Sequence, residues 1–195
     1  MQTETEIQKL IALLNDPNNY FRSKAAKALG QLEAKEAIKP LIALLKDQSW
    51  VVRLSAVQAL GKLGAKEAIP YLIDLLKDPD RDVRYATIVA LGNLGEKEAI
   101  TYLIPLLKDP SLVVRSNAAD ALGDLGAKEA IPYLIALLND PDDDVRYATI
   151  VALGNLGAKK AVKPLIDLLK DPSWVVRSNA ADALGKLGPK KQYPT

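Results

Sequence analysis

Hydrophobic residues recur along this chain with the spacing of an α-helix. In residues 68–77 the apolar side chains lie at i, i+3, i+4 and i+7, and these are Ile69, Leu72, Ile73 and Leu76. That spacing places them on one face of a short helix. A second amphipathic stretch, residues 81–94, comes after Asp78 and Asp80, either of which can cap its N-terminus. The pattern therefore predicts a pair of helices, each with one apolar face.

The helix pair is repeated every 31 residues along the chain. An Asp recurs with this period, and an Arg follows it by six places in every repeat. Self-similarity of this length in helix-forming segments predicts an all-α fold, a right-handed α-solenoid of six stacked antiparallel helix pairs. We expect one domain over residues 1–195, with repeats at about 3–33, 34–64, 65–95, 96–126, 127–157 and 158–188 and a C-terminal tail at 189–195.

Two sets of glycines accompany the second helix of the repeat. One set lies inside the helix, where glycine costs about 1 kcal/mol relative to alanine, so its recurrence indicates close packing against the next repeat. This set is Gly30, Gly61, Gly92, Gly123, Gly154 and Gly185. The other set follows the helix and predicts left-handed C-caps; it is Gly64, Gly95, Gly126, Gly157 and Gly188. In the first repeat Glu33 replaces this glycine, so we expect a less regular helix end there. Pro105 lies within a first helix, where its missing N–H should remove a backbone hydrogen bond.

The repeat carries the motif D-P-x-x-x-V-R-x-x-A-x-x-A-L-G-x-L-G followed by A-I-x-x-L-I-x-L-L. Over nearly the whole chain this resembles the HEAT-like repeats of the phycobilisome lyase type. The resemblance implies that the second helices line a concave surface and that Asp and Arg side chains bridge successive repeats. The structural ladder so implied consists of Asp47, Arg53, Asp78, Arg84, Asp109, Arg115, Asp140, Arg146, Asp171 and Arg177.

Composition argues against catalysis and against several classes of partner. The 26 basic and 24 acidic residues nearly balance, so we expect neither a nucleic-acid nor a membrane partner. The chain has no Cys and no His, which removes thiol nucleophiles, serine triads and zinc sites. The iron-dependent hydroxylase that resembles this fold holds its metals with His-Glu pairs. We therefore expect no enzyme, no cofactor and no metal, and a cytoplasmic location, because no signal peptide or membrane span is evident.

Two carboxylates lie close together in the sequence of one second helix. Asp120 and Asp124 are four residues apart on a second helix and should project together. Such a pair can bind a cation or act as acid and base, but a solvated acidic face is the commoner meaning.

The outward face of the second helices is the candidate binding surface. Positions 7, 8, 11 and 15 after each repeat Asp avoid the apolar face. Tyr85 beside Val89 is unexpected on a helix face that only contacts water, whereas aromatic side chains among polar groups are typical of binding surfaces. Packing of the tyrosine over the neighbouring helix explains its presence equally well. The predicted partner-binding residues are Leu54, Gln58, Tyr85, Val89, Asn93, Asn117, Asp120, Asp124, Tyr147, Val151, Asn155, Asn179 and Asp182. Trp50 and Trp174 are interpreted as covering adjacent turns, with exposure toward a partner as the alternative.

The sequence also shows a longer period and an unprotected end. Residues 82–95 and 144–157 are identical in sequence, so the copied unit spans 62 residues. Duplication and deliberate construction both produce such copying. No further helix follows the last repeat to shield Val176, Ala180 and Leu184, so we expect self-association through this C-terminal end or coverage of it by another molecule.

The sequence thus predicts a non-catalytic scaffold whose concave surface binds another protein or peptide. The alternative from the resemblance is a bilin lyase or chaperone-type subunit acting on phycobiliproteins, in which Tyr85, Tyr147 and nearby carboxylates hold a tetrapyrrole. A third alternative is an engineered repeat scaffold without a native partner, for which the 62-residue copying is the indication.

Overall fold

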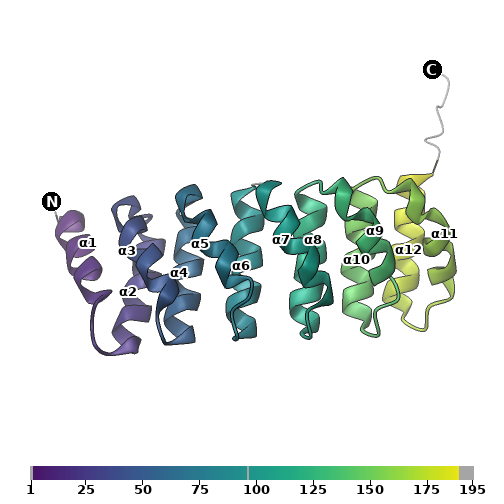
Figure 1. The fold of residues 1–195 in the computed structure, drawn as a ribbon. Coiled ribbons are helices and arrows are strands. Elements are labelled where there is room, and N and C mark those ends of the chain that lie inside the picture. The colour runs from purple at the N-terminus through teal and green to yellow at the C-terminus, as the bar shows by residue number, and fades with distance from the viewer. Residues whose placement is uncertain (1, 96, 189–195) are drawn as a thin grey trace, which may run out of the picture. The chain divides into compact units, whose positions relative to one another are not determined.

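The computed structural model describes residues 2–95 and 97–188, and its helices form two compact units, Met1–Ala99 and Ile100–Thr195 (Figure 1). The first unit contains α1 (Gln2–Leu13), α2 (Asn19–Gln31), α3 (Ile38–Ala43), α4 (Trp50–Lys62), α5 (Ile69–Leu75) and α6 (Arg81–Leu94). The second unit contains α7 (Ile100–Leu103), α8 (Leu112–Asp124), α9 (Ile131–Leu137), α10 (Asp143–Asn155), α11 (Val162–Asp167) and α12 (Trp174–Leu187). The described residues include no strand, and the predicted all-α solenoid of repeated helix pairs is confirmed.

The second helices form the continuous layer of each unit. In the first unit α4 packs between α2 and α6, and in the second unit α10 packs between α8 and α12 (Figure 1). Their inward leucines are fully buried, as Leu60 and Leu153 show with no exposed surface. Burial of such a side chain stabilises the fold by about 2 kcal/mol, so the stack of second helices supplies much of the core.

Helix α6 shows why the second helices begin where they do. The Asp80 side chain accepts hydrogen bonds from the backbone N–H groups of Asp82 (2.9 Å) and Val83 (3.2 Å), which is the geometry of an N-cap. Asp78 instead accepts from the Asp80 N–H at 2.9 Å, in the turn before the helix. Of the two caps allowed by the sequence, Asp80 is therefore the one used, and Asp78 orders the approach to it.

Close helix packing explains some of the glycines inside the second helices. A Cβ placed on Gly30 would lie 2.8 Å from Ala59 Cα, and one placed on Gly123 would lie 2.9 Å from Ala152 Cα. These distances are shorter than van der Waals contact, so only glycine fits without a shift of the neighbouring backbone. The predicted packing reason is confirmed at Gly30 and Gly123, where the neighbour includes backbone as well as side chain. It is wrong for Gly185, where a Cβ would meet no atom within 4 Å, and at Gly154 a Cβ would make only an ordinary contact of 3.6 Å.

The glycines after the second helices are left-handed, with one exception. Gly64, Gly95, Gly126 and Gly157 have φ between 63° and 70°. The prediction is wrong for Gly188, whose φ of −67° and ψ of 168° are extended. The residue that follows Gly188 in the sequence is Pro189, and a residue before proline is driven toward extended conformations.

Glu33 adopts the left-handed conformation without being glycine. Its φ is 53°, close to the 63° of Gly64, so the less regular helix end expected in the first repeat is not found. In other repeats a glycine adopts this conformation in the turn between the second helix and the first helix of the next repeat. The first repeat forms the same turn with Glu33, and the left-handed conformation of a residue with a Cβ lowers the stability of the fold by about 1–2 kcal/mol.

Replacing Glu33 by glycine is therefore expected to raise the free energy of unfolding by about 1 kcal/mol, as the left-handed strain is relieved. The measurement is urea unfolding followed by circular dichroism. The reciprocal change, Gly64→Glu, should lower stability by a similar amount, since a Cβ at Gly64 meets no atom within 4 Å and only the backbone conformation is at stake. Equal effects of the same sign at both sites would contradict this account.

Apart from α1, the first helices are short and partly 3₁₀. Segments of 3₁₀ helix precede or follow them at Lys35–Ala37, Leu44–Lys46, Lys66–Ala68, Lys97–Ala99, Ile104–Lys108, Lys128–Ala130, Lys159–Ala161 and Leu168–Lys170. α7 is the shortest, with four residues, and it changes to 3₁₀ at Ile104, directly before Pro105. The missing N–H of proline accounts for the early end of α-helical bonding there. In the described part of the chain, no helix is long and apolar enough to cross a bilayer.

Candidate functional site

An ion pair joins consecutive repeats within each unit. Arg53 donates from Nε to Asp78 Oδ2 at 2.7 Å and from Nη2 to Asp78 Oδ1 at 2.9 Å, a bidentate arrangement. Its Nη1 donates to the Asp47 carbonyl at 2.8 Å, so the guanidinium also fixes the turn before its own helix. The same bidentate geometry joins Arg22 to Asp47, Arg115 to Asp140 and Arg146 to Asp171.

The remaining ladder residues make backbone contacts. Arg84 donates from Nη1 to the Asp78 carbonyl at 2.8 Å, and Arg177 donates to the Asp171 carbonyl at 2.7 Å. Asp109 Oδ1 accepts from the Ser111 N–H at 2.8 Å. The four bidentate pairs are largely buried, with at most 17% of any side chain exposed. Their carboxylates are therefore held by arginine and backbone N–H groups and are not free to bind a ligand.

The electrostatics of Asp47 follow from these contacts. Burial acts to raise the pKa of Asp47, but the hydrogen bonds from Arg22 and from the Ser49 N–H, together with the arginine charge, hold that pKa below its usual range. The carboxylate stays ionised at neutral pH. This behaviour is typical of a structural ion pair and not of a general base, which needs a pKa near the working pH.

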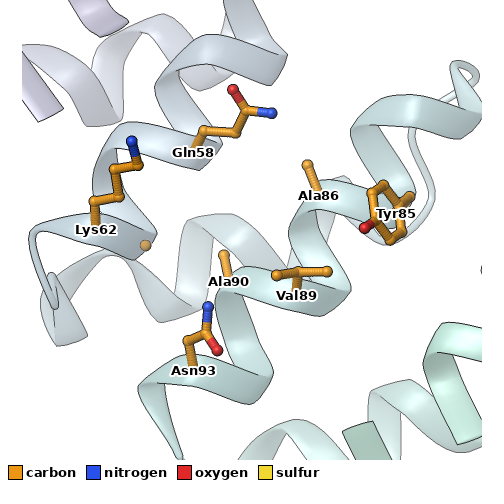
Figure 2. A pocket seen from close by; sticks show the side chains of 8 residues that line it. Gln58, Lys62, Tyr85, Ala86, Val89, Ala90 and Asn93 are labelled. Atoms are coloured by element: carbon orange, nitrogen blue, oxygen red, sulfur yellow. The ribbon is translucent and has the colours of Figure 1, made fainter. Parts of the chain in front are cut away.

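A groove between α4 and α6 brings several predicted binding residues together (Figure 2). It has a volume of about 400 Å³ and is lined by Gln58, Gly61, Lys62, Tyr85, Ala86, Val89, Ala90 and Asn93. Tyr85 and Val89 are 39% and 38% exposed, whereas Ala86 and Ala90 are buried beside them. The groove therefore presents two half-exposed apolar side chains among the polar groups of Gln58, Lys62 and Asn93.

A second groove, of about 340 Å³, lies between α10 and α12. It includes the predicted residues Val151, Asn179 and Asp182, together with Lys186. Asn179 donates from its side-chain amide to the Val175 carbonyl of its own helix at 2.9 Å. Part of its hydrogen-bonding capacity is thus already used.

The other predicted binding residues are at least partly exposed and lie on α4, α8 and α10, and those on α8 line neither groove. Asn155, Asp120 and Asp124 are exposed, Leu54 and Asn117 are half-buried, and Tyr147 is 41% exposed. Burial raises the pKa of Asp120, and the charge of Asp124 adds to this effect. Within the described residues no group of three or more metal-ligating side chains is brought together.

The structure contradicts the sequence-based prediction at two sets of residues. Position 8 after the repeat Asp does not face outward in every repeat, because Ser55, Ala86 and Ala148 are buried. The Ser55 hydroxyl contacts the Ser23 hydroxyl at 3.0 Å, and the small alanines allow close helix approach. The prediction that Trp50 and Trp174 cover adjacent turns and are buried is also wrong. Trp50 and Trp174 are 43% and 71% exposed, because they occupy the first turn of α4 and α12, in the same repeat position as the exposed Arg81 and Asp143.

Comparison with known families gives a match along most of the chain. The HEAT repeat family matches residues 7–91, 69–153 and 131–195. The chain belongs to the HEAT repeat family. No curated protein matches it.

Solved structures add relatives of this HEAT repeat protein. The complex of CpcE and CpcF of phycocyanin lyase from Nostoc sp. PCC7120 is similar, with 30% identity, a TM-score of 0.70, and coverage of 93% of this chain and 76% of that chain. A computationally designed armadillo repeat protein for modular peptide recognition is 25% identical, with a TM-score of 0.65 and coverage of 92% and 99%. An engineered protein is also 25% identical, with a TM-score of 0.66 and coverage of 93% and 96%.

Proposed function

We propose that this HEAT repeat protein is a non-catalytic scaffold that binds another protein or a peptide on the outward face of its second helices. The groove between α4 and α6 carries the proposal, because it leaves Tyr85 and Val89 more than a third exposed beside polar side chains. Exposed aromatic and aliphatic groups in a concave site are the usual anchors for a partner. The rigid helices hold these side chains in place, so binding loses little free energy to ordering.

The relatives support binding without specifying the partner. The phycocyanin lyase structure is a complex of two proteins, CpcE and CpcF, and the designed armadillo protein is built for peptide recognition. Repeat proteins of this kind offer extended surfaces made from equivalent positions of successive repeats. The residues Tyr85, Val89 and Asn93 of α6 recur two repeats later as Tyr147, Val151 and Asn155 of α10, so each unit carries one such set.

Removal of the apolar anchors is expected to weaken binding. A Tyr85→Ala, Val89→Ala variant should bind a partner captured by the wild-type protein at least about tenfold more weakly, since loss of an anchor costs upward of 1 kcal/mol. The measurement is isothermal titration of the purified partner. Tyr102→Ala is the matched control, because Tyr102 is 48% exposed but lies on the first helix α7. A control variant that weakens binding as much as the double variant would contradict the proposed face.

A bilin-handling role is the alternative supported by the similarity to phycocyanin lyase. The two functions are separated by a bilin titration followed by absorbance. A change in the bilin spectrum that disappears in the Tyr85→Ala, Tyr147→Ala variant would favour the bilin-handling role. An unchanged spectrum together with a captured protein partner would remove it.

We also propose that this protein self-associates through α12. The expected exposure of Val176 and Ala180 is wrong, because both are fully buried, and Leu184 is half-buried. Ala181 is instead exposed on α12, whereas Ala119 on α8 and Ile150 on α10 occupy the same repeat position and are fully buried. Contact with a second copy would remove this apolar surface from water. Sedimentation velocity should show mass increasing with concentration, and Ala181→Asp should abolish the increase. A wild-type monomer at every concentration would contradict the proposal.

A further inference from the structure

Two cavities of the first unit share residues of α4. The groove between α4 and α6 is lined by Gln58 and Lys62, and both also line a cavity of about 230 Å³ between α2 and α4. The second cavity adds Lys27, Gln31, Ser55 and Ala59. Figure 2 shows Gln58 and Lys62 on α4 and Val89 and Asn93 on the neighbouring α6. We call the combined surface the α2/α4/α6 groove.

The charge of the α2/α4/α6 groove is of one sign. Its lining residues include the exposed cations Lys27 and Lys62 and no carboxylate. Among the described residues, neither lysine forms an ion pair. Unneutralised lysines beside an apolar patch produce a positive local potential that favours anionic partners.

The 62-residue copy shows that folding does not require this charge. Tyr147, Ala148, Val151 and Asn155 of α10 repeat the residues that α6 contributes to the groove. On the helix beside them, α8, Asp120 and Asp124 occupy the places of Gln58 and Lys62. α8 nevertheless packs closely on α10, with Gly123 against Ala152 as Gly61 lies against Ala90. The apolar residues are thus the same in both copies, while the side chains beside them change from neutral or positive to negative. The helix packing therefore does not depend on the charge at these positions.

We propose that the α2/α4/α6 groove binds an acidic peptide segment in which Asp or Glu residues flank an apolar side chain. The apolar side chain packs against Tyr85, Ala86 and Val89, and the carboxylates pair with Lys27 and Lys62. Gln58 and Asn93 offer donors and acceptors for the peptide backbone. This inference rests on the proposed function, since it specifies the partner of the same face.

The test uses three labelled peptides of equal length with the same leucines and with Glu, Gln or Lys at all other positions. Fluorescence anisotropy with the full chain should give the tightest binding for the Glu peptide, about tenfold tighter than for the Gln peptide at low ionic strength, and the advantage should shrink with added salt. The Lys62→Asp variant should lose most of this preference. It is expected to fold, because Asp124 occupies the same place in α8; circular dichroism checks this.

The control is Lys35→Asp, which changes net charge equally in the same unit but lies in the 3₁₀ segment Lys35–Ala37, outside the groove lining. It should keep the preference for the Glu peptide. Equal affinities for the three peptides would overturn the inference and leave the proposed function standing, whereas no binding of any peptide would overturn both. Equally tight binding of a single-stranded oligonucleotide of the same charge would also overturn the inference, because the groove would then attract anions without selecting a peptide.

Discussion

Replacing Arg146 by alanine is expected to lower the free energy of unfolding by about 3 kcal/mol, because it breaks a buried bidentate ion pair. Arg146 donates to both carboxylate oxygens of Asp171, at 2.9 and 3.0 Å, and the two side chains are only 11% and 7% exposed. Without the guanidinium, the Asp171 carboxylate would stay largely buried next to fewer donors. The measurement is urea unfolding at neutral pH, compared with the wild-type protein.

Arg177→Ala is the matched control for this prediction. Arg177 donates to the carbonyls of Asp171 and Pro172, just as Arg146 donates to those of Asp140 and Pro141. Among the described residues, however, no carboxylate pairs with Arg177. Its removal should cost only about 1 kcal/mol, so equal losses in the two variants would show that the ion pair adds nothing.

Acid should remove the advantage of the wild-type protein over Arg146→Ala. Burial acts to raise the pKa of Asp171, but hydrogen bonds from Arg146 and the Ser173 N–H hold it below its ordinary value. A lowered folded-state pKa gives stability that is present above the unfolded value of about 4 and is lost as the pH falls through the folded value. The difference in unfolding free energy between wild type and variant should therefore shrink below about pH 4.

The repeat and its helices could be predicted because they depend on local spacing. The second helix expected at residues 81–94 forms at Arg81–Leu94, since its apolar period, its preceding Asp80 and its following Gly95 all act within a few residues. The early end of α7 could be predicted from Pro105 for the same reason. Local chemistry also explains Gly188, because the effect of Pro189 outweighs the tendency of glycine toward a left-handed cap.

The candidate site was harder to predict because it depends on how neighbouring repeats pack. Periodicity placed Ser55 on the outward face, yet its hydroxyl contacts Ser23 of the preceding repeat and is buried. Periodicity placed Lys62, fifteen residues after Asp47, on the same outward face as Gln58, but it gave no sign that Lys62 lines one groove with Tyr85 of the next repeat. The available signal was the comparison of positions 62 residues apart, where Lys62 corresponds to Asp124. That comparison reveals a change in charge, but only the packed helices show which residues it faces.

Alanine at the interior glycines of the second unit is expected to have effects that follow the space available at each site. A Cβ at Gly123 would lie 2.9 Å from Ala152 Cα, one at Gly154 would lie 3.6 Å from Ala183 Cβ, and one at Gly185 would meet no atom within 4 Å. Gly123→Ala forces helices α8 and α10 apart and should lower the free energy of unfolding by about 2 kcal/mol, as overpacking in a close-packed core does.

The other two sites gain helix propensity without a clash of that kind. Gly154→Ala forms an ordinary van der Waals contact, and Gly185→Ala enters open space, so each should raise stability by up to about 1 kcal/mol. All three variants replace glycine by alanine inside a second helix of the same unit. A difference in helix propensity therefore cannot explain a difference in their stabilities. Urea unfolding should therefore rank Gly123→Ala far below the wild type and the other two at or above it. Three equal stabilities would mean that the spacing between second helices does not explain the recurring glycine.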